Sequence, residues 1–124
     1  ETSAIPVIVV SARAGEEARV EGLEGVLAAH RLDALVAPTG GLPWLVDPVN
    51  GDSVSGGCSS LPAVAGTPHI TIPAGYFREL PVGISFMGPA WSEPMLLGFG
   101  HAFEVATRER KEPSFLPTVP GVHA

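Results

Sequence analysis

The chain has 124 residues, of which 16% are charged, and its formal net charge is −6. This length bounds it to one domain or less. Its seven lysines and arginines are too few for the basic surface that binds phosphates, so we exclude direct contact with nucleic acid. Cys58 is the only cysteine, which excludes an intramolecular disulfide and a cysteine-based metal site and favours a reduced, cytoplasmic protein.

The first predicted elements are an extended segment, a helix and a strand. Residues 5–10 suit an extended segment and are too short to span a bilayer, and we see no signal peptide. Residues 14–31 predict an amphipathic helix. Residues 34–37 are continuously apolar, which is typical of a strand covered on both faces. The apolar face of the helix would consist of Val20, Leu23, Val26, Leu27 and His30.

Residues 38–57 predict a long loop, because Pro, Gly, Asp and Asn are dense there and no helical or strand period is visible. A loop of this length is usually functional or mobile. A site-lining loop and a disordered linker therefore both stay open. Trp44 favours the first, since a flexible linker rarely contains an indole.

A short helix and two strands are predicted next. Residues 57–65 suit a short helix interrupted by Pro62. Residues 69–75 and 82–88 predict strands, and the connection between them is short enough to make them antiparallel neighbours. Pro68 and Pro81 precede them, where the N–H that proline lacks is dispensable.

Residues 92–111 predict a second helix, with Ser92 as its N-cap. We interpret three cations near its end as complementing the helix dipole: Arg108, Arg110 and Lys111. One apolar stripe is expected along it, formed by Met95, Leu96, Phe99, Ala102, Phe103 and Ala106. Residues 112–124 are proline-rich and predict an extended tail, from which Phe115 and Leu116 could dock on the body.

Candidate nucleophiles and bases are present, but none forms a convincing pair. The serine-rich residues 53–60 lack the pattern of a nucleophile elbow or a phosphate loop, so a turn with an N-cap is the favoured interpretation. Lys111 is the only lysine and lies at a charged helix end, whereas a lysine base must be desolvated. Asp47 and Asp52 fit ordinary turn chemistry, and nothing suggests a metal site. We interpret the histidines, like Cys58, as structural: His30, His69, His101 and His123.

Four blocks occur in an order that resembles the C-terminal part of the amidase signature family, whose members hydrolyse or transfer carboxamides. The resemblance covers residues 23–117 and implies a Ser–Ser–Lys triad on a large α/β/α layered domain. In that family the triad lies N-terminal to the part represented here, so we carry over no catalytic residue. The blocks are LDALVAPTGGLPW, GGCSSLPAVAGTPHITIPAG, LPVGISFMG and WSEPMLLGFGHAFEVATR.

The resemblance therefore implies a fold of the α/β class: part of an α/β/α layered structure, with a mixed sheet, a β-hairpin and two main helices. We expect residues 1–124 to form a single C-terminal fragment of an amidase domain, with a long loop over 38–57 and an extended tail over 112–124. That loop would lie near the substrate entrance, and no cofactor or metal is implied. The candidate entrance residues are Trp44, Asp47, Asn50 and Asp52.

The predicted function is that of a segment of a hydrolase acting on carboxamide bonds. Its partners would be the missing N-terminal portion and a small amide substrate, with no membrane, and the chain by itself would be inactive. One alternative is the A subunit of a tRNA-dependent amidotransferase, which typically reads N-L-A-G-L-P where residues 63–68 lack the asparagine. A small α/β interaction or self-association module is the other, suggested by a mean hydropathy of +0.29. Because the chain begins with Glu1 rather than Met, we expect its true start to be missing or removed.

Overall fold

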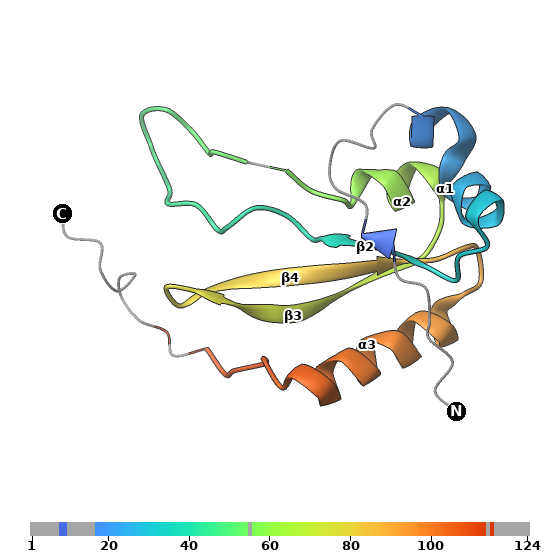
Figure 1. The fold of residues 1–124 in the computed structure, drawn as a ribbon. Coiled ribbons are helices and arrows are strands. Elements are labelled where there is room, and N and C mark those ends of the chain that lie inside the picture. The colour runs from blue at the N-terminus through green and yellow to red at the C-terminus, as the bar shows by residue number, and fades with distance from the viewer. Residues whose placement is uncertain (1–7, 10–16, 55, 114, 116–124) are drawn as a thin grey trace.

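The computed structural model describes residues 8–9, 17–54, 56–113 and 115. Within these residues, four strands and three helices follow one another, and Figure 1 shows how they are arranged. They are β1 (Ile8–Val9), α1 (Glu17–His30), β2 (Leu35–Pro38), α2 (Ser60–Ala65), β3 (His69–Phe77), β4 (Leu80–Met87) and α3 (Glu93–Thr107). None of the helices in the described residues is long and apolar enough to cross a membrane.

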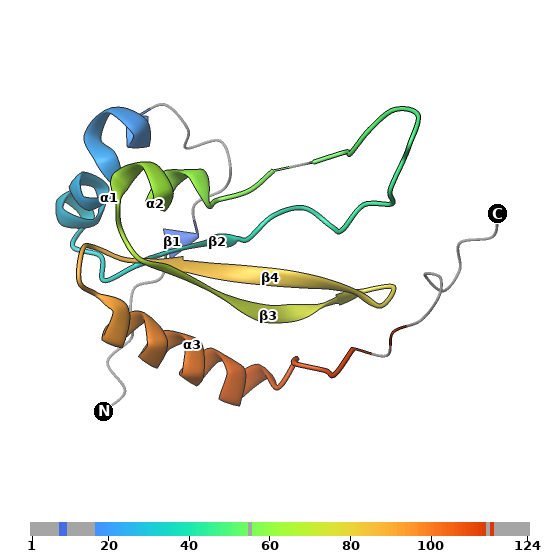
Figure 2. The same cartoon turned by 180° about the vertical axis from the view of Figure 1, so that it is seen from behind.

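The strands form one mixed sheet with helices on both faces. Their order is β1-β2-β4-β3, with β1 parallel to β2 and the other neighbours antiparallel. The α3 helix covers one face, while α1 and α2 lie on the opposite side (Figures 1 and 2). This arrangement confirms the predicted layered α/β class with a mixed sheet, a hairpin and two main helices.

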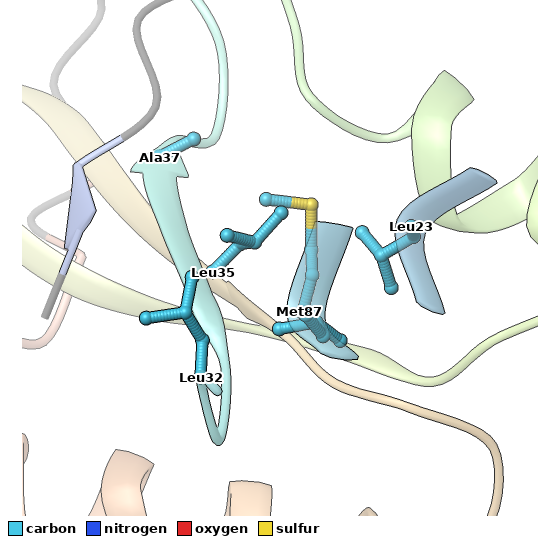
Figure 3. Close-up of a cluster of buried hydrophobic side chains, with 6 residues drawn as sticks. Leu23, Leu32, Leu35, Ala37 and Met87 are labelled. Atoms are coloured by element: carbon cyan, nitrogen blue, oxygen red, sulfur yellow. The ribbon is translucent and has the colours of Figure 1, made fainter. Parts of the chain in front are cut away.

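The face toward α1 and α2 is closed by a leucine-rich cluster. Leu23 contributes from α1, Leu35 from β2 and Met87 from β4, and each is at most 1% exposed. Leu35 and Met87 are direct partners across the two strands, so the register brings them together (Figure 3). The remaining buried members are Leu27, Leu32 and Ala37, with Val26, Cys58 and Leu61 packed against them.

The opposite face is closed by α3. Leu96 is fully buried there, and the rings of Phe99 and Phe103 lie with their centroids 6.3 and 6.1 Å from that of Phe86 on β4. Gly100 lets the helix approach the sheet, because a Cβ at this position would lie 2.6 Å from the Cδ1 atom of Ile70. The predicted stripe is right at four of its six positions, since only Ala102 and Ala106 are exposed to water.

The hairpin is tighter than the sequence predicted. Only Arg78 and Glu79 connect β3 to β4, both with positive φ (49° and 67°), as a two-residue turn of matching twist requires. The predicted connection over residues 76–81 was therefore too long, because Pro81 pairs with Tyr76 inside the ladder. Proline is accepted there because β2 reaches β4 only over residues 84–87.

Both long helices differ from the prediction. Gly22 has φ 72° and ψ 161°, which breaks the helical path inside α1. The α3 helix ends at Thr107, and Arg108 follows with a left-handed φ of 53°. The cations at 108, 110 and 111 therefore follow the last turn, with Arg108 at the C-cap, so the predicted helix end at residue 111 was wrong. That these cations complement the helix dipole stays a prediction.

Three smaller predictions are corrected or fall outside the structure. Pro62 does not interrupt α2, because it lies in the first turn, where no intrahelical N–H bond is required. Ser92 occupies the N-cap position of α3, but its hydroxyl makes no capping hydrogen bond. Phe115 is 89% exposed rather than docked. The predictions for residues 5–7, 10, 14–16 and 116–124 lie outside the described residues.

Candidate functional site

The candidate site is the long connection between β2 and α2. It leaves the sheet at Thr39 and returns at Cys58, whose N–H donates to the Thr39 carbonyl over 3.3 Å. Gly40 and Gly57 form an antiparallel bridge at the same point. Beyond this base the loop extends away from α2, on the side of the sheet opposite α3 (Figures 1 and 2).

Asp47 and Asn50, two of the predicted entrance residues, are joined in a turn at the tip of the loop. The Oδ1 atom of Asp47 accepts the N–H groups of Val49 and Asn50 at 2.9 and 3.0 Å, and the Asn50 amide donates to Oδ2 at 2.8 Å. The backbone N–H of Asn50, its side-chain amide and the N–H of Val49 hold the pKa of Asp47 below its usual 3.8. Asp47 is thus an anionic turn former, unsuited to donating a proton near neutral pH.

Trp44 and Asp52 are not drawn into this turn. Both are exposed, and no side-chain hydrogen bond within the described residues joins Asp52 to Trp44, Asp47 or Asn50. The loop surface is instead largely apolar. Its exposed side chains include Leu42, Trp44, Leu45, Val46, Val49 and Val54, with exposures of 39 to 87%.

A row of hydroxyl groups lies at the base of the loop, and it was missed by the sequence reasoning. The buried Ser85 hydroxyl on β4 lies 2.8 Å from that of Thr39 and 2.9 Å from that of Thr71 on β3. A Cβ at Gly83 would lie 2.7 Å from the Thr39 hydroxyl, so the missing side chain leaves room for this row. Only the strand register could have revealed it, since Thr71 pairs directly with Ser85.

The candidate nucleophiles of the serine-rich segment lack a base beside them. Ser53, Ser59 and Ser60 are exposed, and no hydrogen bond within the described residues links them to a histidine or to Lys111. Cys58 is half-buried against the leucine-rich cluster and directs its thiol at the Thr39 carbonyl, 3.8 Å away. Where the structure describes this segment, the arrangement therefore offers packing and turn formation, with no nucleophile activated by a neighbour.

Lys111 lies at the opposite end of the sheet from the leucine-rich cluster. Its ammonium nitrogen is 4.6 Å from the centroid of the Tyr76 ring, and its backbone N–H donates to the Tyr76 hydroxyl at 3.0 Å. The side chain is exposed, so it lacks the desolvation that a lysine base needs. The described residues also contain no group of three or more His, Cys, Asp or Glu side chains that could hold a metal ion.

Comparison with known proteins gives consistent relatives, although no family model matches the chain. It is 36% identical over 105 residues to a putative amidase of Arthroderma benhamiae, covering 72% of this chain and 15% of the relative. It is 33% identical over 90 residues to the A subunit of the glutamyl-tRNA(Gln) amidotransferase of Dehalococcoides mccartyi, covering 68% of this chain and 18% of that subunit.

A solved structure extends this similarity to the fold. The chain is 50% identical to the native peptide amidase from Stenotrophomonas maltophilia, with a TM-score of 0.65 over 83% of this chain and 21% of that one. The chain thus spans about a fifth or less of the length of each protein named here.

Proposed function

Because the chain belongs to the amidase signature family, as a C-terminal segment of it, we propose that it forms part of an enzyme that hydrolyses carboxamide bonds. The observation that carries the proposal is the 50% identity to a peptide amidase over most of the chain, on a matching fold. Peptide amides are therefore the substrates to test first.

The chemistry must come from residues outside this segment. Amide hydrolysis needs a nucleophile for the carbonyl carbon, a base to take its proton, and a proton donor for the departing nitrogen. The family resemblance implies that two serines and a lysine supply these roles. Here the one lysine is an exposed Lys111 over a tyrosine ring, and the exposed serines have no base beside them.

The role of the segment would be structural and peripheral to the chemistry. It contributes strands to the sheet, α3 to one of its faces, and the loop over residues 40–57 to the substrate entrance. The loop's exposed apolar side chains support this role, because water-facing Trp44, Leu45 and Val46 suit contact with the apolar part of an amide substrate. Asp47 and Asn50 would keep the tip in its turned shape, and Asp52 would line the same entrance.

Ammonia release tests this proposal. The intact protein that contains the segment should release ammonia from peptide amides, while the 124-residue chain by itself should release none above the buffer rate. Turnover by the isolated chain at a rate comparable to the intact protein would overturn the assignment of the chemistry to other residues. Failure of the intact protein with all carboxamides tried would overturn the hydrolase assignment.

An amidotransferase A subunit is the second candidate, since one such subunit is 33% identical to the chain. The lower identity and the absence of asparagine in residues 63–68 favour the amidase. The two functions separate in one assay. An amidotransferase subunit would release ammonia from glutamine efficiently only with its partner subunits and a charged tRNA, whereas the amidase would need neither.

Two further proposals concern location and association. We propose cytoplasmic residence, supported by the half-buried free thiol of Cys58 and the absence of any other cysteine in the sequence. We also propose that the isolated chain self-associates, because Val64, Trp91 and Leu97 are exposed and β3 has one edge without a strand partner in the described residues. Cell fractionation tests the first, and light scattering of the isolated chain tests the second.

A further inference from the structure

We propose that Thr39 is a positioning residue that fixes the direction of the loop over residues 40–57, and that the hydroxyl row through Ser85 to Thr71 holds Thr39 in place. The proposal rests on the proposed function only where it concerns the substrate. Its structural part concerns how the loop is held to the sheet.

Both ends of the loop meet at Thr39, which makes four hydrogen bonds there. Its N–H donates to the Gly83 carbonyl at 2.9 Å, and its hydroxyl lies 2.8 Å from that of Ser85. Its carbonyl accepts the N–H of Cys58 at 3.3 Å and the thiol of the same residue at 3.8 Å. The start of the loop, its end and the central strand β4 are thereby joined through one residue.

The Ser85 hydroxyl makes this junction specific. It is fully buried, and its two hydrogen bonds run to Thr39 on one side and Thr71 on the other. A buried hydroxyl that loses a partner is costly, so Ser85 favours the single Thr39 rotamer that reaches it.

Little else in the described residues directs the loop. Its side-chain hydrogen bonds beyond the base stay within the turn formed by Asp47, Val49 and Asn50. Residues 41–46 and 48–54 are exposed along their whole length. The junction at Thr39 therefore controls where Trp44 and the tip lie relative to the sheet face that carries the hydroxyl row.

A matched set of variants in the intact protein tests this inference. Thr39→Val keeps the shape and removes the hydroxyl, while Thr39→Ser keeps the hydroxyl. Thr67→Val is the control, since the Thr67 hydroxyl is buried and has no hydrogen-bond partner among the described residues. Thr71→Val is a milder variant that leaves the bond between Thr39 and Ser85 in place.

Two readouts are measured for each variant. In Thr39→Val, hydrogen exchange at the amides of Thr39 and Cys58 should speed up about three- to tenfold, the loss expected for one hydrogen bond. Exchange in α3 should not change. The KM for a peptide amide should rise by a similar factor, about three- to tenfold, with kcat within about twofold, because loop contacts act in binding rather than in the chemical step. Thr39→Ser and Thr67→Val should match the parent, and Thr71→Val should lie between.

The possible outcomes test the positioning role of Thr39 separately from the proposed hydrolysis of amides. Unchanged exchange at Thr39 and Cys58 in Thr39→Val, or an equal effect in Thr67→Val, would overturn the positioning role. A fall in kcat with KM unchanged would also overturn it. If the parent hydrolyses no amide, the proposed function fails, and the exchange data still decide whether Thr39 holds the loop. If Thr39→Val does not fold, the graded exchange in Thr71→Val, compared with Thr67→Val, gives the same decision.

Discussion

The packing of α3 on the sheet depends on Gly100, and replacing this residue with alanine gives the sharpest test of the fold. An alanine Cβ would lie 2.6 Å from Cδ1 of Ile70, and 3.2 and 3.3 Å from Cδ1 and Cγ1 of Ile72. The first contact is closer than real Cβ atoms show, although a side-chain terminus can rotate away. The contacts with Ile72 are harder to relieve, since this side chain is only 5% exposed.

Two effects of opposite sign determine the result for Gly100→Ala. Alanine is favoured over glycine inside a helix by about 1 kcal/mol. Overpacking a closely fitted interface costs about 1–3 kcal/mol. Because the helix must move off both isoleucines or force them from their rotamers, we expect the cost to outweigh the gain, with a net loss of up to about 2 kcal/mol in the stability of α3.

Gly98→Ala is the matched control in the same helix. Gly98 is exposed, and a Cβ there would meet nothing within 4 Å, so only the helix preference acts. We expect a gain of about 0.5–1 kcal/mol. Native-state hydrogen exchange of the α3 amides gives both free energies in the intact protein. If Gly100→Ala stabilises α3 as much as Gly98→Ala does, the helix does not approach the sheet as described.

Three other predictions concern separate parts of the molecule. Leu96→Ala leaves a cavity at a fully buried position of α3, so the same exchange measurement should show α3 less stable by about 2–5 kcal/mol. An NMR titration should place the pKa of Asp47 below 3.8, because hydrogen bonds to Asn50 and Val49 favour the carboxylate. The carboxylate of Asp47 therefore stabilises the turn fully above pH 3.8, and this stabilisation is lost as the pH falls through the lowered pKa. Asn50→Ala should raise the pKa toward 3.8 without reaching it, since the backbone donors remain; an unchanged value would contradict the assignment. Tyr76→Phe removes the hydroxyl that accepts the Lys111 N–H and should speed exchange of that amide about threefold or more, while exchange in β2 stays as before.

Those parts of the fold that depend on local pattern could be predicted from the sequence. The run at 34–37 is apolar at every position because its side chains alternate between the two faces of the sheet and both faces are covered. Leu35 packs toward α1 and Val36 toward α3. The hairpin was also predictable from its two apolar segments. Its turn was not, because Arg78 and Glu79 carry positive φ without the glycine or asparagine that usually signals it.

The helix boundaries were the least predictable feature. Gly22 lies among good helix formers, and its φ of 72° breaks the helical path there. The end of α3 at Thr107 is similar, since Arg108 is an unusual residue for a left-handed C-cap. In both places the residue pattern by itself would continue the helix, so the break could not be predicted from it.

The candidate site was predictable only in part. The dense turn formers marked the loop, and the Asp-Pro-Val-Asn order at residues 47–50 was consistent with the turn that forms. The hydroxyl row could not be predicted from the sequence, because Thr39 and Ser85 are separated by 46 positions and meet only through the strand register. Whether the four entrance residues contact substrate stays a prediction.

We propose that this segment shapes an amidase without supplying its catalytic groups. The most direct measurement is ammonia release from a peptide amide by the intact protein carrying Lys111→Met, together with Ser59→Ala and Ser60→Ala. The account predicts that kcat stays within about twofold of the parent, because these side chains are exposed, no hydrogen bond joins them to a catalytic partner among the described residues, and surface substitutions rarely matter. Loss of turnover by several orders of magnitude, with the fold intact by hydrogen exchange, would show that the segment holds the nucleophile or the base and would contradict the claim.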